Sequence, residues 1–161
     1  MALNVASLPI TVGVGAFVIR DGALLVVRRT YGPSKGLWTI PSGYLEPDES
    51  VAQAVEREVR EETAVAARAE SIVGVRNRVA GEANDTFLVF AMAYESGEPR
   101  PDGREVSEAA FRPLDEVSRS EDSAPFTRAI VPKLMRSRGM RLDVYAPPGD
   151  GSGTLAYLLY I

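Results

Sequence analysis

One helical segment of this chain must bury an apolar face while it carries glutamates along the border of that face, and this restricts the fold more than any other feature. It lies within the stretch from Gly43 to Val65, which reads GYLEPDESVAQAVEREVREETAV. At about 100° per residue, Glu58, Glu61 and Glu62 fall in one sector roughly 100° wide. The apolar stripe consists of Val51, Val55 and Val59. Because Glu62 projects between valines of the stripe, we expect it to border the core.

The start of this helix carries a capping signature. Ser50 suits the N-cap and Gln53 suits the third helical position, as in a capping box. Pro47 and Asp48 precede it, which is usual for a loop that ends at a helix start. The pattern therefore predicts a helix over 51–63.

The acidic sector has a cost that a bound cation would remove. Like charges three and four residues apart repel by roughly a few tenths of a kcal/mol per exposed pair. Glu61 and Glu62 also lie in the last turn, where the helix macrodipole disfavours anions. A hard cation held by carboxylate oxygens offsets both effects. The alternative is a solvated acidic face, but Gln53, Glu56 and Arg60 already occupy the polar face of the helix.

Two residue types are missing from the chain, and this excludes whole classes of site. There is no cysteine and no histidine. Disulfides, cysteine nucleophiles, thiolate zinc sites and Ser-His-Asp triads are therefore excluded. Ligation by oxygen alone favours Mg²⁺ or Mn²⁺ over zinc. General acid–base chemistry falls to Glu, Asp, Lys, Tyr or a metal-bound water.

Size and charge narrow the class of protein further. At 161 residues the chain is expected to form one domain, with about 139–161 as a C-terminal extension. A net charge of −4 argues against an extended nucleic-acid surface, but it allows a small phosphate-bearing ligand in a local basic pocket. No apolar run reaches about 18 residues, and the N-terminus lacks the basic region of a signal peptide. We expect a cytoplasmic protein without a membrane span.

Alternation and turn signals predict a sheet around the helix. Strands are expected over 10–20, 23–29, 38–40, 71–80, 86–94 and 105–112, a short helical turn over 113–117, and a second long helix over 125–137. The strand 86–94 contains FLVFAMAY and is apolar on both faces, so both faces are expected to be covered. An α/β fold with helices on both faces of the sheet follows.

The C-terminal tail reads as a hairpin joined by a flexible loop. It contains RLDVYA, then PPGDGSG, then TLAYLLYI. We interpret it as an extra edge pair on the sheet, since exposed apolar edges are usually protected. The alternative is a homodimer contact or a pocket cover through Tyr157 and Tyr160.

The helical segment resembles the signature of a known family. Gly43, Glu49 and the run REVREETAV at 57–65 are similar to the Nudix box, Gly-x5-Glu-x7-Arg-Glu-U-x-Glu-Glu-x-Gly-U, in which U is bulky and apolar. The run WTIPSG at 38–43 also resembles the strand and turn that lead into this box. The resemblance covers residues 10 to about 138 and implies the Nudix α/β/α sandwich with a mixed sheet.

Two positions depart from the family pattern. Ala64 stands where the pattern has glycine, and alanine would be strained there if the residue takes positive φ; the chain could instead leave the helix with ordinary φ. Ser42 stands where many members have a second glycine. The resemblance implies that a backbone carbonyl at this position is a metal ligand, and serine still supplies one.

The resemblance implies hydrolysis of the pyrophosphate bond of a nucleoside diphosphate linked to another moiety, with Mg²⁺, or Mn²⁺, as cofactor. It implies Glu58 and Glu62 as direct metal ligands and Glu61 as a further ligand, through water. Glu49 would orient Arg57 or a metal-bound water. Phosphoanhydrides are strongly anionic, so a carboxylate-rich surface repels them unless cations intervene. The moiety stays open among nucleotide sugars, ADP-ribose, NTPs and capped RNA.

Further site residues are expected outside the box. A distant carboxylate serves as base or ligand in the family, and Glu105 is the candidate because it follows a turn just ahead of a strand; Glu108 and Glu98 are alternatives. Candidate substrate contacts are Arg28, Arg76, Arg78 and Trp38, and Arg29, which ends the same strand as Arg28 near the Tyr31 loop, is a further candidate for a phosphate contact. The two arginines at 76 and 78 share one strand face. A stacking tryptophan competes with the more frequent buried one.

Two other functions compete with the hydrolase. One is a non-catalytic nucleotide or ADP-ribose sensor on the same fold, which would not need to keep every glutamate of the box. The other is an unrelated α/β protein with an accidental glutamate cluster, which the spacing disfavours.

Overall fold

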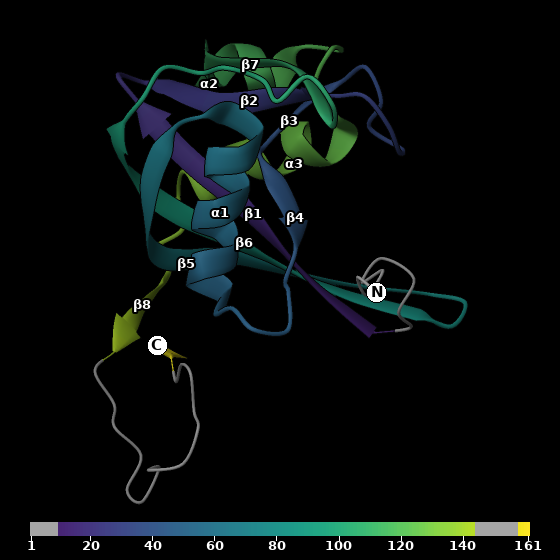
Figure 1. Ribbon diagram of the computed structural model, residues 1–161, viewed down its shortest axis with the longest axis vertical. Helices are drawn as coiled ribbons and strands as arrows, with labels where there is room; N and C mark the ends of the chain where they lie inside the picture. The colour runs from purple at the N-terminus through teal and green to yellow at the C-terminus, as the bar shows by residue number, and fades with distance from the viewer. Residues whose placement is uncertain (1–9, 144–157) are drawn as a thin grey trace, which may run out of the picture.

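The structure is a computed structural model and describes residues 10–143 and 158–161 (Figure 1). Its elements in chain order are β1 (Ile10–Arg20), β2 (Ala23–Arg29), β3 (Trp38–Thr39), β4 (Ser42–Tyr44), α1 (Val51–Thr63), β5 (Ala66–Ala80), β6 (Ala83–Ser96), β7 (Val106–Pro113), α2 (Leu114–Arg119), α3 (Pro125–Leu134), β8 (Met140–Asp143) and β9 (Leu159–Tyr160). Among the described residues, no helix is both long enough and apolar enough to cross a membrane.

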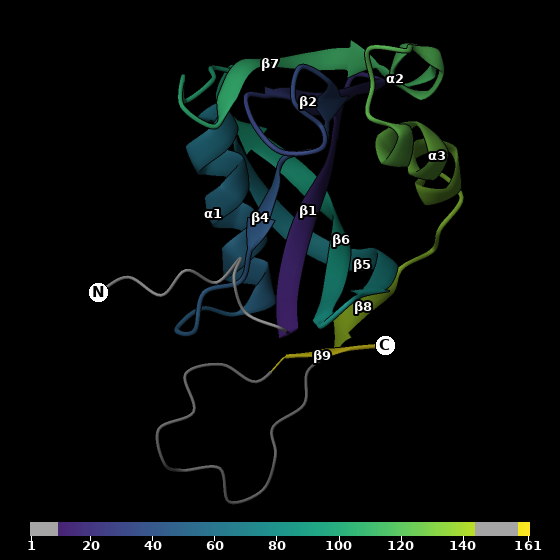
Figure 2. The same cartoon turned by 90° about the vertical axis from the view of Figure 1, so that its right-hand side faces the viewer.

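The strands form a mixed sheet in the order β3-β2-β1-β6-β5-β8-β9, with β4 paired to β1 and β7 paired to β2. β1 and β6 run parallel, and the other pairs are antiparallel. Figure 2 shows α1 on one side of the sheet and α3 on the other. The predicted α/β sandwich with a mixed sheet is therefore confirmed.

Each face of the sheet has its own core. Leu25, Val55 and Phe90 belong to the cluster under α1. Trp38 and Val131 belong to the cluster on the side of α2 and α3. β6 contributes alternate residues to both clusters, which is why its sequence is apolar at successive positions.

Helix α1 has the predicted bounds and the predicted cap. The Ser50 hydroxyl accepts a hydrogen bond from the backbone N–H of Gln53 at 3.2 Å, and the Gln53 side chain accepts one from the N–H of Ser50 at 2.9 Å. At the other end Ala64 takes φ 60°, a left-handed conformation. Alanine therefore occupies the position where the family glycine is free of strain.

Several strands differ from the prediction. β3 ends at Thr39, and the chain then forms β4, which the glycine- and proline-containing sequence 41–48 did not indicate. β4 pairs with β1 across Gly43↔Val14, a contact distant in sequence. β5 begins at Ala66, earlier than expected. β6 begins at Ala83 instead of residue 86, so the turn between β5 and β6 is tighter than expected, with Gly81 at φ 59°.

The C-terminal strands form the expected edge pair. β8 pairs with β5, and β9 pairs with β8 in antiparallel register. The ring of Tyr160 packs edge-on against the core residue Phe90, with 5.7 Å between ring centroids. The other tyrosine of the predicted dimer or pocket contact, Tyr157, lies outside the described residues.

Candidate active site

The first part of the site is the contact between helix α1 and strand β4. A methyl group at Gly43 would lie 2.1 Å from the carboxyl carbon of Glu58, so only glycine leaves room for that carboxylate against the strand. Burial raises the pKa of Glu58, against the opposing effect of Arg57. The carboxylate of Glu58 therefore lies beside the backbone of Gly43.

Glu62 lies deeper, between α1 and the end of β2. Only 2% of the residue is exposed. The guanidinium of Arg29 donates to both oxygens of its carboxylate, and the backbone N–H of Ser42 donates to Oε2 at 3.1 Å. Burial raises the pKa of Glu62 to about 7, although Arg29 opposes the shift. The same Arg29 also donates from Nη2 to the carbonyl oxygen of Ser42 at 2.9 Å.

Arg57 links the remaining glutamates of the helix and its preceding loop. Its Nη2 donates to Glu49 Oε1 at 2.6 Å, and its Nε donates to Glu49 Oε2 at 2.9 Å. Its Nη1 donates to Glu58 at 2.7 Å and to Glu61 at 3.3 Å. The expected contact of Arg57 with Glu49 is therefore present, and the same guanidinium also contacts Glu61. This hydrogen bonding lowers the pKa of Glu49.

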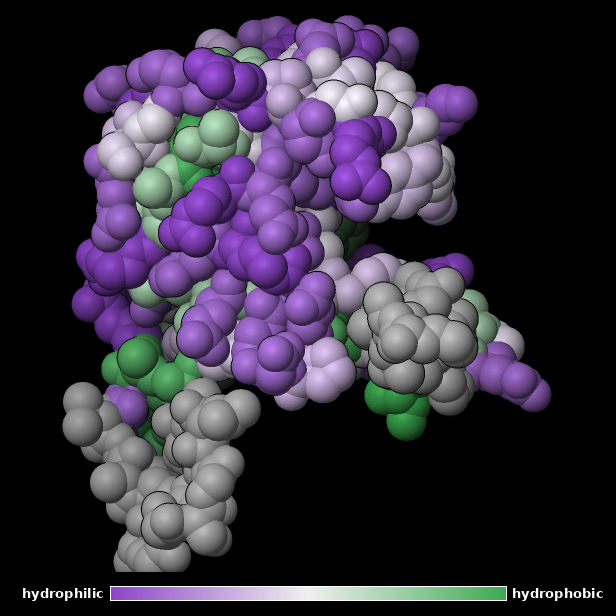
Figure 3. All heavy atoms as spheres, in the orientation of Figure 1, coloured by the Kyte–Doolittle hydropathy of each residue, from purple (hydrophilic) through white to green (hydrophobic). Residues whose placement is uncertain are grey.

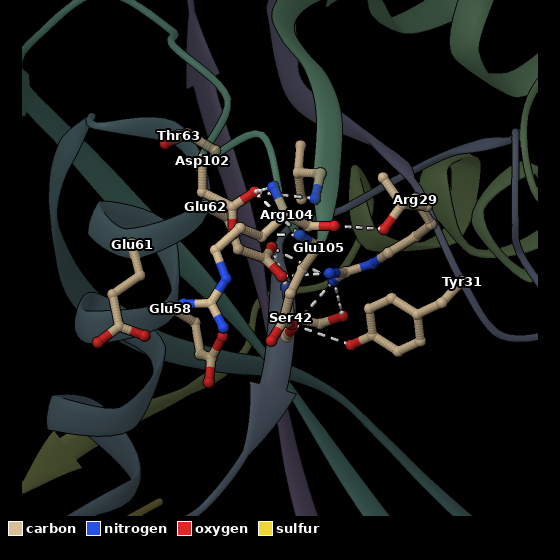
Figure 4. Close-up of polar contacts among 12 residues, drawn as sticks. Arg29, Tyr31, Ser42, Glu58, Glu61, Glu62, Thr63, Asp102, Arg104 and Glu105 are labelled. Carbon is tan, nitrogen blue, oxygen red and sulfur yellow. Dashed lines mark hydrogen bonds and ion pairs between the residues drawn. The ribbon is translucent and has the colours of Figure 1, made fainter.

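The three helix glutamates do not share one environment. The side chain of Glu61 is 60% exposed and points away from Glu58 and Glu62 in Figure 4. In the part of the chain that the structure describes, no three acidic side chains form a group that could hold a metal ion. Arg29 and Arg57 neutralise the carboxylates instead. The surface around α1 is mainly hydrophilic, as Figure 3 shows.

The donor set nevertheless suits a hard cation. The carboxylate of Glu62 lies beside the backbone of Ser42, and the carboxylate of Glu58 lies against the next residue, Gly43, which has no side chain to occupy that space. All of these donors are oxygens, which Mg²⁺ and Mn²⁺ prefer. We call the space beside Gly43, bordered by the carboxylates of Glu58 and Glu62, the cradle. It fits such an ion once Arg29 and Arg57 release some of their hydrogen bonds to these carboxylates.

A second wall of the site comes from two loops. The Tyr31 hydroxyl donates to Glu105 at 3.0 Å, which places the predicted distant carboxylate beside the end of β2 (Figure 4). Burial and the Glu105 contact raise the pKa of Tyr31 to about 12, and the charges of Arg29 and Glu62 also act on it. Glu105 is therefore near the glutamates of α1.

Asp102 shapes the loop that carries Glu105. Its carboxylate accepts hydrogen bonds from the backbone N–H groups of Arg104 at 2.9 Å, Glu105 at 3.1 Å and Val106 at 2.9 Å. Burial opposes ionisation here, but the three backbone donors outweigh it and lower the pKa of Asp102. The alternative acids are paired elsewhere: Glu108 with Arg28 and Glu98 with Arg20.

Apart from Arg29, which lies beside Glu62, the predicted substrate contacts lie away from the glutamates of α1. Trp38 is only 5% exposed and belongs to the core beside α2 and α3. The guanidinium of Arg28 lies 4.9 Å from its ring centroid. Arg76 pairs with Asp85 and lies 5.5 Å from the ring centroid of Phe126 on α3.

The strand pattern explains why these residues are separated from the glutamates. Arg28 and Arg29 are consecutive on β2, so they point to opposite faces. Arg78 is exposed and shares a strand face with Arg76, two positions away. The structure does not bring Arg28, Trp38, Arg76 or Arg78 together with the acids of α1.

Two residues with site contacts, Asp102 and Tyr31, were not among the predicted site residues, and the pairing of Arg29 with Glu62 was not predicted. The side of the sheet that Arg29 faces could have been found by counting in twos from Leu25, which faces the core under α1. Asp102 carried the signal of a turn, Asp-Gly, but its carboxylate depends on loop geometry. For Tyr31 no local pattern indicated the contact with Glu105.

Comparisons with known proteins support a family assignment. A family model described as the NUDIX domain matches residues 9–134. Nudix hydrolase 8 of Arabidopsis thaliana is 34% identical over 110 residues, which cover 65% of this chain and 30% of that protein. An ADP-ribose pyrophosphatase of Methanocaldococcus jannaschii is 30% identical over 108 residues, covering 66% of this chain and 63% of that protein. The chain thus spans less than two thirds of either relative.

Two solved structures share the fold. A MutT NUDIX hydrolase from Burkholderia pseudomallei has a TM-score of 0.67 and 28% identity, covering 76% of this chain and 96% of that one. A MutT protein from Methanosarcina mazei Go1 has a TM-score of 0.69 and 26% identity, covering 81% of this chain and 96% of that one.

Proposed function

The chain belongs to the Nudix hydrolase family, and from this premise we propose that it is a pyrophosphohydrolase that cleaves a nucleoside diphosphate joined to a second moiety. The observation that carries the proposal is the convergence of Glu58, Glu62 and the carbonyl oxygen of Ser42 beside the side-chain-free Gly43. A phosphoanhydride needs a cation at such an acidic surface. The proposed domain comprises residues 1–161, with 139–161 as an extension beyond the family match.

We assign the metal ligands to Glu58, Glu62 and the carbonyl of Ser42, with Glu61 acting through water. Mg²⁺ is the proposed ion, and Mn²⁺ is its substitute. When bound, the ion neutralises phosphate charge and makes water a better nucleophile. Arg57 positions Glu58 through the 2.7 Å contact and is itself held by both oxygens of Glu49.

The proton acceptor in the proposed reaction is Glu105. Its carboxylate is exposed and accepts a hydrogen bond from the Tyr31 hydroxyl at 3.0 Å, beside the end of β2. The chain has no histidine that could take this role. Asp102 fixes the backbone of the loop, so Glu105 stays on the side of α1 where a substrate phosphate would lie.

ADP-ribose is the first substrate to test. The archaeal relative that is 30% identical over 108 residues is named for pyrophosphatase activity on this compound. Hydrolysis would add water across the anhydride and release AMP and ribose 5-phosphate, both of which are phosphomonoesters. Nucleotide sugars, dinucleoside polyphosphates and NTPs complete the panel.

The test is an assay with and without added metal. The protein is incubated with each compound in Mg²⁺, in Mn²⁺ or in EDTA, and phosphatase then releases phosphate from any new monoester; NTP reactions are resolved by chromatography because phosphatase attacks NTPs directly. We expect turnover of at least one compound, lost in EDTA and reduced about 100-fold or more in Glu62→Gln. Glu70→Gln, an exposed acid on β5, is the matched control for the change of charge. Tight binding without turnover would favour the sensor instead.

A further inference from the structure

Arg29 holds the same acceptor atoms that the proposed metal ion needs. Its two terminal nitrogens reach both oxygens of Glu62, and Nη2 also donates to the carbonyl oxygen and the hydroxyl of Ser42, each at 2.9 Å. Figure 4 shows this guanidinium reaching from the end of β2 into the site. We propose that Arg29 is an internal counter-cation that competes with the metal ion for Glu62 and Ser42.

The burial of the pair gives Arg29 this role in the metal-free protein. The side chains of Arg29 and Glu62 are 8% and 3% exposed. A buried carboxylate without a partner is strongly disfavoured, so the ionised form of Glu62 needs a cation beside it whether or not a metal ion is bound. Arginine suits the place because its planar fork satisfies a carboxylate and a carbonyl together. The inference rests on the proposed function, since it assumes that a metal ion binds here.

Competition follows from charge and from shared acceptors. A divalent ion on Glu62 and Ser42 would lie next to the guanidinium, and two cations repel each other strongly where water is largely excluded. Metal binding therefore requires Arg29 to give up part of its contacts.

This role predicts two effects of opposite sign for Arg29→Met. The metal-free protein should unfold at a lower temperature, because Glu62 loses its partner. Its affinity for Mn²⁺ should rise, with Kd lower by about tenfold or more, since tenfold corresponds to 1.4 kcal/mol. If Arg29 only shaped the site, its removal would lower both the unfolding temperature and the affinity for Mn²⁺. Free Mn²⁺ is measured by electron paramagnetic resonance, and stability by thermal unfolding in EDTA.

Matched variants separate the local effect from the change in net charge. Arg28→Met removes the same charge one residue away, on the opposite face of β2, and should leave the Kd for Mn²⁺ unchanged. Arg29→Met combined with Glu62→Gln should recover stability in EDTA, because no buried charge is left unpaired. Arg29→Lys keeps the positive charge but loses the planar fork of the guanidinium, so its Kd for Mn²⁺ should lie between those of the wild type and Arg29→Met. This variant also keeps the test possible if Arg29→Met does not fold.

The outcomes show separately whether the competition by Arg29 fails and whether the proposed metal site itself fails. Tighter Mn²⁺ binding together with lower metal-free stability supports the competition. If the wild type binds Mn²⁺ and both Arg29 variants bind it equally or more weakly, the competition is refuted while the metal site stands. If neither the wild type nor any Arg29 variant binds Mn²⁺, the proposed metal site itself is refuted.

Discussion

Replacing Glu62 by glutamine should change how the stability of the metal-free protein depends on pH. Burial raises the pKa of this carboxyl from an ordinary value of 4.5 to about 7 in the folded protein. Between these two values the folded state binds a proton that the unfolded state has released. Stability must therefore fall as pH rises from about 4.5 to about 7, and it must level off above that range.

The size of the effect follows from the shift in pKa. One pKa unit corresponds to 1.36 kcal/mol, so a shift from about 4.5 to about 7 costs the wild type about 3 kcal/mol at neutral pH relative to pH 4.5. Glutamine lacks this proton equilibrium but keeps an oxygen that can accept from Ser42 and Arg29. The wild type should consequently lose about 3 kcal/mol relative to Glu62→Gln across this range.

Urea unfolding in EDTA at several pH values between 4.5 and 7.5 measures this difference. Other acids titrate in both proteins, so the informative quantity is the wild-type free energy of unfolding minus that of Glu62→Gln. Glu61→Gln removes the same charge from the neighbouring exposed position and controls for the helix end. Parallel curves for the wild type and Glu62→Gln would show that burial does not retain the proton on Glu62.

Three further substitutions test single features of the structure. Ala64→Gly should raise the free energy of unfolding by about 1 kcal/mol, because glycine adopts the left-handed cap without strain; a loss of stability in urea titrations would contradict this. Gly43→Ala should lower kcat/KM about 100-fold, because the methyl displaces Glu58 by ångströms while the fold persists by circular dichroism; near-normal kinetics would count against the cradle. Tyr31→Phe should lower kcat about tenfold with little change in KM, because Glu105 loses its anchor; an effect on KM alone would remove Glu105 from the chemistry.

The helix and its cap were predictable because their signals are local. Ser50, Gln53 and the valine stripe specify α1 without knowledge of the rest of the chain, and the predicted and observed bounds agree. The burial of Glu62 also followed from helical spacing. Family resemblance added the position of the left-handed cap at Ala64, but only the structure shows that alanine adopts it.

The rest of the site depends on contacts between distant segments. Strand β4 exists because Gly43 and its neighbours pair with β1, which no local propensity indicates. Arg29 faces the glutamates and Arg28 does not, and this depends on which face of β2 lies under α1. Arg76 and Arg78 were chosen as substrate contacts because they share one strand face, but the sheet directs Arg76 toward α3.

A manganese-soaked crystal tests the central claim most directly. Anomalous scattering recorded near the manganese absorption edge locates the ion without assumptions about its ligands. The proposed site predicts a peak at roughly 2.0–2.3 Å from carboxylate oxygens of Glu58 and Glu62 and from the carbonyl oxygen of Ser42. A fully occupied peak elsewhere, with Arg29 still on Glu62 and Ser42, would contradict it.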